Sequence, residues 1–445
     1  MKKSILYHVL LVIVISFASF STVAQILSER DRADLKDSLL ADRFDNLLPK
    51  LMDDADMDMW LVISREYNED PVMRTMLPAT WLNARRRTIL VFYRNKAKNT
   101  IEKLAVARYD VGKNITSAWD KEKQPDQWAR LVEIINERNP NKIGVNMSEY
   151  FGIADGLVQT DYSELKDALP ENLERKLVSA EKLAIAWIET RTEKEMELYN
   201  TLVSVTHAII DEAFSAEVIT PGTTTTDDVV WWMRQKVTDM GLETWFHPTI
   251  DVQRDSEALK SHIDSFSSGY AEKLIIPGDL LHCDFGITYI GLNTDCQEHA
   301  YVLKKGETAV PTYLSEAFKK GNRVQDIFTG NFELGKTGNE ILAASLAQGK
   351  AEGMRPAIYT HPLGTYGHSS GTTLGMWDSQ GGVPVNGDYP LHYDTVYAIE
   401  LNTTVNIPQW KKDIRIMLEE AGFFGKQGFR YVNGRQEAIK PITWK

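Results

Sequence analysis

Acidic side chains interrupt the apolar, strand-like segments in the last third of this chain. Residues 278–295 read GDLLHCDFGITYIGLNTD, in which a strand-like stretch carries Asp284, turn residues follow, and a second short strand leads to Asp295. If the two stretches pair as a hairpin, the two aspartates can be cross-strand neighbours on one face. Two carboxylates at such a short distance repel each other unless they share a proton or a cation. For a lone pair, one aspartate capping a turn and the other facing solvent would be the simpler interpretation.

Further segments add residue types that bind metals. Residues 361–368 read HPLGTYGH and place His361 and His368 in a glycine-rich stretch. Two later strand-like segments carry the remaining acids, Glu400 in residues 396–400 and Glu419 with Glu420 in residues 414–420. Burial of a carboxylate on an apolar strand is costly without a counter-charge. Four carboxylates and a histidine that converge from separate strands would suit a pair of divalent metals about 3.5–4 Å apart.

The region before these segments has a different pattern. Residues 25–180 alternate helical and strand patterns, which is typical of an α/β domain. The pattern predicts a helix at 48–55 and strands at 59–63, 88–92 and 142–145. The glycines are scattered, so no dinucleotide or P-loop fingerprint is present. From about residue 180 the chain becomes long and helical, and we therefore expect a second domain over residues 181–445.

The second region contains a faint internal repeat. Gly222 and Gly335 each begin the order Gly-x-Thr-x-x-acid, which is followed by an apolar-periodic stretch and a closing glycine, Gly241 or Gly353. Two related halves are plausible on this basis, although a glycine before a helix is common by chance.

The N-terminus indicates export. Lys2 and Lys3 precede an apolar run over residues 5–20, and small residues continue to Ala24. This is the pattern of a secretory signal peptide over residues 1–24, with cleavage before Gln25. The run is short and no stop-transfer pattern follows, so we expect no stable membrane anchor after its removal. The mature protein is therefore predicted to be exported, to the periplasm in a bacterium, or secreted.

Charge and cysteine content exclude other classes. The chain has 62 acidic and 50 basic side chains and a net charge of −12, which disfavours nucleic-acid binding. Its longest basic run is Arg85-Arg86-Arg87. Two cysteines are too few for a disulfide scaffold or a zinc ribbon. Cys283 and Cys296 flank the two aspartates and can face each other across the hairpin, and we expect two buried thiols rather than a disulfide.

The order of the candidate ligands resembles that of the pita-bread metallopeptidases: Asp284, Asp295, His361, Glu400 and a glutamate on the final strand. That family includes methionine aminopeptidases, Xaa-Pro aminopeptidases, prolidases and the metal-free creatinases. The spacing of eleven between the aspartates and the segment His-x-x-Gly-x-x-x-His match its motifs. The N-terminal region resembles that of the aminopeptidase P, prolidase and creatinase branch. The resemblance implies an α/β N-terminal domain followed by an α+β pita-bread catalytic domain with two pseudo-symmetric halves.

Some positions depart from the family pattern. The family usually ends with Arg-Ile-Glu-acid, but here Arg415-Ile416 is followed by Met417-Leu418 and only then by Glu419. We expect Glu419 to be the ligand through a two-residue bulge or shift, with Glu420 as the reserve candidate. His368 is followed by serine rather than an acid. For the family histidine upstream of the hairpin, His262 is the nearest candidate and His247 the competitor.

The resemblance also implies roles. Asp284 would bind one metal, His361 and Glu400 the other, and Asp295 and Glu419 would bridge them. Such metals lower the pKa of a shared water toward neutrality, and the oxygen-rich ligands favour Mn²⁺, with Zn²⁺ or Co²⁺ also possible.

The remaining roles concern catalysis and substrate. Glu400 would act as general base, while His368, with His262 as a second candidate, would hydrogen-bond the scissile carbonyl. The implied substrates are peptides or dipeptides with an N-terminal Xaa-Pro bond, and a homodimer is possible. A peptide-binding pseudoenzyme and a metal-free creatinase-like hydrolase are the alternatives.

Overall fold

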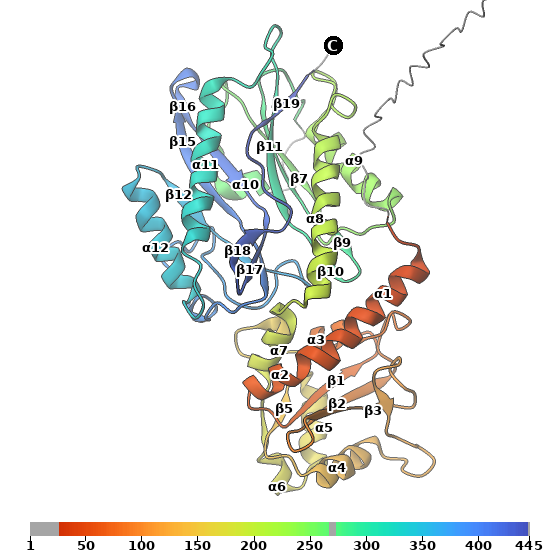
Figure 1. Cartoon of the computed structure of the whole chain (residues 1–445). Helices are drawn as coiled ribbons and strands as arrows, with labels where there is room; N and C mark the ends of the chain where they lie inside the picture. Colours follow the sequence, from red (N-terminus) through yellow and green to blue (C-terminus); the bar gives the residue numbers. More distant parts are fainter. Residues whose placement is uncertain (1–25, 267–272, 444–445) are drawn as a thin grey trace, which may run out of the picture.

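The computed structural model describes residues 26–266 and 273–443, which form two lobes (Figure 1). The predicted signal peptide lies outside the described residues and stays a prediction. Among the described residues, no helix combines the length and hydrophobicity that a bilayer crossing needs. The expected α/β N-terminal domain and mixed catalytic domain are both present.

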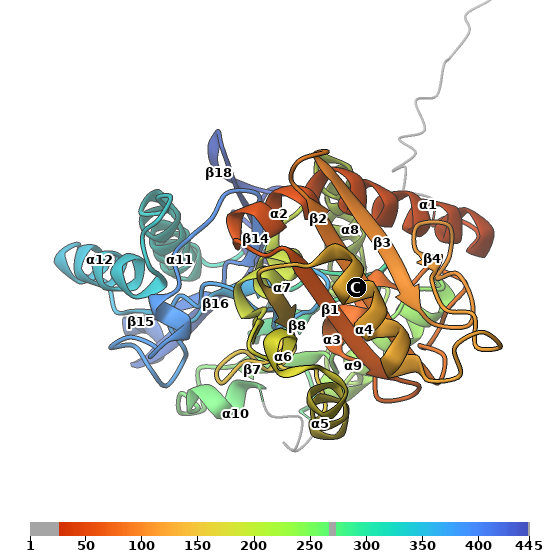
Figure 2. The ribbon, with the colours of Figure 1, turned by 90° about the horizontal axis from the view of Figure 1, so that it is seen from below.

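A twisted sheet with helices on both faces forms the core of the N-terminal lobe (Figure 1, Figure 2). In the described residues its strand order is β4-β3-β2-β1-β5-β6, with β1 antiparallel to β2 and parallel to β5. Side chains alternate along β1: Trp60 and Val62 join the hydrophobic core on one face, while Leu61 and Ile63 join the core on the other. Burial on both faces explains why this strand reads as a continuous apolar run.

The elements of this lobe follow the predicted pattern. The strands are β1 (Met59–Arg65), β2 (Arg87–Asn95), β3 (Thr100–Val106), β4 (Thr116–Ser117), β5 (Ile143–Val145) and β6 (Leu177–Ser179). The helices are α1 (Glu29–Asp42), the π-helical η1 (Arg43–Leu47), α2 (Leu48–Asp54), α3 (Pro71–Met76), α4 (Gln127–Arg138), α5 (Gln159–Ala168), α6 (Glu171–Glu174) and α7 (Glu181–Glu189).

The C-terminal lobe packs several small sheets inside a shell of helices (Figure 1). Its sheets have the orders β19-β11-β8-β7, β12-β15-β16 and β13-β14-β17-β18, with a short β9–β10 ribbon. The helices are α8 (Glu193–Ala213), α9 (Thr226–Asp239), α10 (His262–Phe266), α11 (Thr312–Gly330) and α12 (Gly338–Ala351). The first strands are β7 (Thr249–Gln253), β8 (Leu280–Phe285), β9 (Thr288–Tyr289), β10 (Leu292–Asn293) and β11 (Cys296–Val302). The later strands are β12 (Pro356–Ile358), β13 (His361–Leu363), β14 (Thr395–Ala398), β15 (Leu401–Ile407), β16 (Lys412–Leu418), β17 (Ala421–Gly425), β18 (Gly428–Tyr431) and β19 (Lys440–Ile442).

The two helices that follow the repeated sequence order begin with the same local structure. Thr225 caps the start of α9 and Thr337 caps the start of α12, and each receives a reciprocal contact from the acid three residues later. Both helices therefore begin with a capping box, which satisfies two backbone N–H groups at each helix start. In the second half the box residues are those of the shared order Gly-x-Thr-x-x-acid, whereas in the first half the box lies one residue later, on Thr225 and Asp228 rather than on Thr224 and Asp227.

The hairpin register differs from the one expected. Strand β8 pairs with β11, but Asp284 lies opposite Gln297, and Cys283 lies opposite Glu298. Between β8 and β11 the chain forms the short β9–β10 ribbon, which turns at Ile290 and Gly291 with positive φ angles. Residues that the expected hairpin placed in the strand pairing lie in this ribbon instead. The two cysteines are therefore not directly opposite each other, and both are buried free thiols.

Buried arginines join the two lobes. The Arg43 guanidinium from η1 lies 2.8 Å from Glu195 Oε2 on α8, and Arg191 Nη1 lies 3.3 Å from Glu195 Oε1. Arg43 also donates to the carbonyl oxygens of Thr190 and Trp187. Burial alone would raise the pKa of Glu195, but the two guanidiniums outweigh this effect and hold the pKa below its usual value.

We predict that Glu195→Ala lowers the free energy of unfolding by about 3–5 kcal/mol, because it leaves two buried guanidiniums without their carboxylate. The measurement is urea unfolding followed by tryptophan fluorescence. Glu193→Gln, on the exposed side of the same helix start, should cost less than about 1 kcal/mol. Because the pKa of Glu195 is lowered, its contribution is present at neutral pH and is lost as the pH falls through that lowered value. Equal stability of the two variants would contradict a role of this joint.

Candidate metal centre

The five residues predicted as metal ligands come from separate strand ends of the C-terminal lobe. Their positions are Asp284 near the end of β8, Asp295 before β11, His361 at the start of β13, Glu400 between β14 and β15, and Glu419 between β16 and β17. The four acids line one cavity of about 330 Å³. His361 joins them, since ligand atoms of Asp295, His361 and Glu419 all lie within 4.8 Å of one another.

The orientation of His361 suits metal binding. Its Nδ1 lies 3.0 Å from the carbonyl oxygen of Pro362, which makes Nδ1 the protonated donor. The lone pair on Nε2 then faces the acids, at 3.7 Å from Asp295 Oδ2 and 3.6 Å from Glu419 Oε1. A second hydrogen bond of this kind is the usual way in which a protein fixes the tautomer and orientation of a metal-binding histidine.

Several buried polar atoms at the site lack hydrogen-bond partners among the described residues. They are Asp284 Oδ1, Asp295 Oδ1, His361 Nε2 and Glu419 Oε1. A buried acceptor without a partner costs free energy, and here the unpartnered atoms are all electron-pair donors gathered at one place. Carboxylate oxygens with one imidazole nitrogen are suitable ligands for Mn²⁺, Zn²⁺ or Co²⁺. The residues present therefore fit a divalent metal site.

Electrostatics support the same interpretation. Burial raises the pKa of Asp284 to about 7. Burial, together with repulsion from neighbouring carboxylates, also raises the pKa values of Asp295, Glu400 and Glu419 well above normal. Burial lowers the pKa of His361 to about 4. A bound cation would reverse this logic, because it stabilises ionised carboxylates and a neutral imidazole.

Gln297 is a site residue that the sequence analysis missed. Its Nε2 donates to Glu400 Oε1 at 2.6 Å and to Glu419 Oε2 at 2.9 Å, so it orients two of the acids. Gln297 lies directly opposite Asp284 in the β8–β11 pair. Side chains two apart on a strand share a face, so its position two residues after Asp295 is the signal that could have found it.

At the end of β16, Glu419 reaches the site and Met417 does not. The β15–β16 pairing runs without interruption from Leu401–Leu418 to Ile407–Lys412, so the described strand contains no bulge. Met417 is fully buried, and its backbone N–H donates to His299 Nε2. The family order Arg-Ile-Glu-acid thus falls on residues 417–420, with methionine in the arginine position. The expected bulge is therefore absent from the described strand, and the two-residue shift stays the prediction.

Glu420, the reserve candidate, belongs to a different cluster. Its Oε2 lies 2.8 Å from His207 Nε2, and its Oε1 accepts the backbone N–H of Gln436. Burial disfavours a charged His207, but the Glu420 carboxylate outweighs that cost and raises the pKa of His207 to about 9. Glu420 is therefore held in an ion pair and is not among the residues that line the cavity.

Two histidines line the cavity beside the acids. The His368 ring lies perpendicular to that of His361, with ring centroids 4.6 Å apart. His262 stacks on Trp377 at 5.5 Å. His247, the competitor, instead lies 3.1 Å from an Arg234 nitrogen and does not line the cavity. The rest of the described cavity wall is largely aromatic and apolar: Trp245, Phe246, Ile263, Tyr359 and Trp377.

Residues 197–421 match the sequence model of metallopeptidase family M24. The chain belongs to this family. No curated protein matches the chain in sequence.

Solved structures share the fold over most of their length. An X-Pro aminopeptidase from Thermotoga maritima MSB8 has 16% identity and a TM-score of 0.62, covering 88% of this chain and 100% of that one. An Xaa-Pro dipeptidase from Bacillus anthracis has 16% identity and a TM-score of 0.55, covering 93% and 100%. A prolidase from Pyrococcus horikoshii OT3 has 14% identity and a TM-score of 0.53, covering 91% and 99%. The catalytic domain of this M24 enzyme therefore has the pita-bread fold.

We predict that Glu419→Ala loses more than half of the bound transition metal, while Met417→Leu keeps the wild-type content. Glu419 has an unpartnered oxygen at the cluster, whereas Met417 is buried elsewhere and leucine conserves its volume. The measurement is metal content by mass spectrometry after Mn²⁺ reconstitution. Loss of metal in the Met417 variant alone would reverse the assignment.

A pH dependence follows from the raised pKa of Asp284. Without metal, the folded state keeps this proton up to about pH 7, while the normal value is 3.8. The associated stability is present at low pH and is lost as the pH rises through 7. Mn²⁺ binding requires the ionised carboxylate, so the rise in Tm that Mn²⁺ causes should be larger at pH 8 than at pH 6. Glu316→Gln, at an exposed acid on α11, should leave this difference unchanged, and a larger rise at pH 6 would contradict the prediction.

Proposed function

We propose that this M24 enzyme is a dinuclear aminopeptidase or dipeptidase that hydrolyses Xaa-Pro bonds at the N-terminus of short peptides. The observation that carries the proposal is the group of four buried acids and His361, whose unpartnered oxygen and nitrogen atoms meet at one cavity. The family and the Xaa-Pro peptidases among the similar folds support the reaction class.

The proposed ligand arrangement uses all five residues. Asp284 would hold one cation, His361 and Glu400 the other, and Asp295 and Glu419 would contact both. Two divalent cations, with Mn²⁺ favoured by the oxygen-rich donors, would lower the pKa of a water molecule toward neutrality.

Glu400 is proposed as the general base. Gln297 donates to Glu400 Oε1, so Oε2 is the oxygen left to accept a proton from the attacking water. The contact with Gln297 also restricts the carboxylate to one orientation, which lowers the entropic cost of reaching a reactive geometry. A neutral amide is suited to this position, because it orients the acids without adding another charge.

His368 and His262 are proposed to stabilise the oxygen of the scissile carbonyl. Burial lowers the pKa of each to about 4, so both rings are neutral at pH 7 and can donate an N–H without a charge of their own. Donors aimed at the place where negative charge develops are among the largest contributors to catalysis of acyl transfer.

The cavity wall supports the proposed preference for proline. Trp245, Tyr359 and Trp377 give the cavity an aromatic, largely apolar wall, which suits the compact, apolar pyrrolidine ring. A volume of about 330 Å³ is near the lower end of the range for small-ligand pockets, which favours a short peptide.

We predict that His368→Ala lowers kcat on an Xaa-Pro peptide by about 10²- to 10³-fold while the bound metal is retained. The matched control is His247→Ala, whose ring lies outside the cavity and which should keep wild-type kcat. Activity and metal content are measured on the same preparations, with an Xaa-Ala peptide as the specificity control.

The alternative is a peptide-binding protein without catalysis, for which the missing acid after His368 is the remaining observation. Metal-replete wild-type protein that binds Xaa-Pro peptides but does not hydrolyse them would overturn the peptidase and favour this alternative. Equal rates on Xaa-Pro and Xaa-Ala peptides would overturn the proline preference alone.

A further inference from the structure

A second and larger cavity, of about 830 Å³, lies in the N-terminal lobe. It opens at the end of the sheet where β1 and β3 finish and the antiparallel β2 begins. The described residues that line it include five arginines, Arg65, Arg85, Arg86, Arg87 and Arg108, and we call this cavity the arginine pocket. The proposed peptidase does not use these residues.

The arrangement of these arginines is costly in itself. Arg65 and Arg87 lie directly opposite each other across the β1–β2 pair. Like charges at opposed strand positions are destabilising. The cost is tolerated only if opposite charges are supplied, either by the protein or by a ligand.

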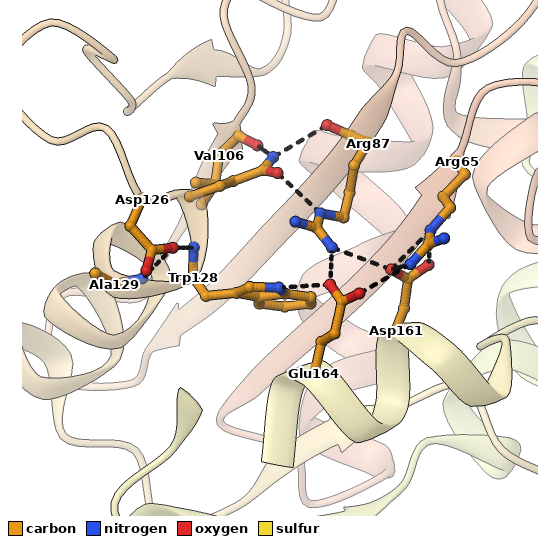
Figure 3. A network of polar contacts seen from close by, with 9 residues as sticks. Arg65, Arg87, Val106, Asp126, Trp128, Ala129, Asp161 and Glu164 are labelled. Carbon is orange, nitrogen blue, oxygen red and sulfur yellow. Dashed lines mark hydrogen bonds and ion pairs between the residues drawn. The ribbon is translucent and has the colours of Figure 1, made fainter. Parts of the chain in front are cut away.

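Acidic side chains of the protein pair with Arg65 and Arg87, which we call the inner arginines (Figure 3). Helix α5 presents Asp161, whose Oδ1 lies 2.8 Å from Arg65 Nη2 and 3.4 Å from Arg87 Nη1. Glu164, one turn further along the helix, pairs with Arg87 and accepts a hydrogen bond from Trp128 Nε1 at 2.9 Å. These contacts hold the guanidinium groups of Arg65 and Arg87 in place and offset their charge.

The other three arginines of the pocket, which we call the outer arginines, have no such acidic partners among the described residues. Arg85, Arg86 and Arg108 are exposed, and within residues 26–266 and 273–443 none of them forms an ion pair. Three carboxylates line the pocket or pair with its arginines: Glu66, Asp161 and Glu164. A fourth, Glu69, accepts the N–H of Ala84 next to Arg85, so four acids face five guanidiniums. The pocket therefore keeps a net positive charge on a chain whose overall charge is −12.

The backbone of Arg86, which lines the arginine pocket, has an unusual conformation. Arg86 has a φ of +51°, in the left-handed region that a long side chain rarely adopts. Glu66 fixes it on both sides, since the Glu66 N–H donates to the Arg86 carbonyl and the Arg86 N–H donates to the Glu66 carboxylate. Residues kept in such conformations are frequent at ligand-binding sites, because the surrounding structure must stabilise them.

Aromatic rings complete the wall. The Arg85 guanidinium lies 4.9 Å from the Trp81 ring centroid and 5.8 Å from that of Tyr109, and Trp119 also lines the pocket. Tyr109 is 56% exposed, so part of it is accessible to a ligand. Guanidinium groups bind phosphates and carboxylates in bidentate geometry, and aromatic faces stack on planar rings.

We propose that the arginine pocket binds a small organic anion that contains at least two acid groups, phosphate or carboxylate, together with a planar ring. Its volume lies within the range of small-molecule sites. Arg85, Arg86 and Arg108 recognise the acid groups, and Trp81, Tyr109 and Trp119 contact the ring.

The test is isothermal titration calorimetry on the full-length mature protein with its metals bound, at low salt. The probes are adenosine diphosphate, benzene-1,3,5-tricarboxylate, and uncharged adenosine. The test variant is the double substitution Arg86→Asn and Arg108→Gln, in which asparagine tolerates the positive φ of position 86. The control is Lys98→Gln, at the exposed turn after β2 on the opposite end of the sheet. Circular dichroism checks that each variant is folded.

We expect at least one of the two charged probes to bind wild-type protein and the Lys98 variant equally, and the double variant at least tenfold more weakly. Affinity should fall as salt is raised, and adenosine alone should not bind. Binding of adenosine diphosphate alone identifies a phosphate ligand, and binding of the tricarboxylate alone identifies a carboxylate ligand. The proposal is overturned if neither charged probe binds at millimolar concentration, or if the folded double variant binds as well as wild type. Because the double substitution lies in the N-terminal lobe, its effect on affinity locates the binding site there, and this result is independent of peptidase activity.

Discussion

Four carboxylates buried around one small cavity are the constraint on which the rest of the catalytic lobe depends. Each would be costly to bury alone, and together they raise one another's pKa values, so that the site favours protons or a cation. The fold brings them together because each acid stands where a strand ends, and strands from both halves of the lobe end at the same place. Among the described residues, Gln297 donates hydrogen bonds to two of these acids, Glu400 and Glu419. A divalent cation is therefore a structural complement of the fold as well as a requirement of the proposed chemistry.

Much of this site could be predicted from the sequence because its signals are local. Asp284 and Glu400 interrupt or end apolar runs, and His361 stands in a short glycine-rich segment, so each is visible without knowing the fold. The predicted register of the hairpin was wrong because the chain forms the β9–β10 ribbon between the two strands. Strand periodicity does not reveal this ribbon, which depends on two residues with positive φ angles. Gln297 was missed because an amide next to a ligand looks like an ordinary polar strand residue until the pairing places it opposite Asp284.

The N-terminal lobe shows the same limit in another form. Its strands were predicted because burial on both faces makes them continuous apolar runs. The basic run at Arg85–Arg87 was visible, but Arg65 and Arg108 lie about twenty residues away on either side. Only the antiparallel pairing of β1, β2 and β3 brings them to one end of the sheet. A cluster built from cross-strand neighbours cannot be found by scanning for charge runs, since its members are close in space and distant in sequence.

The two lobes also meet at the loop that carries the histidines of the metal site. Tyr366 lies between His361 and His368 in sequence, and its hydroxyl donates to the carbonyl of Pro71 at the start of α3. On its other side this loop accepts hydrogen bonds from Asn293, just before Asp295, through the carbonyl of Gly364. A Cβ at position 364 would lie 3.3 Å from the Arg191 guanidinium carbon, so glycine allows the loop to pack closely against the buried arginine joint. The N-terminal lobe thus fixes the loop from one side while the aspartate hairpin fixes it from the other. The position of His368 at the cavity therefore depends on both lobes, which gives the N-terminal lobe a part in the proposed catalytic geometry although it contributes none of the proposed ligands.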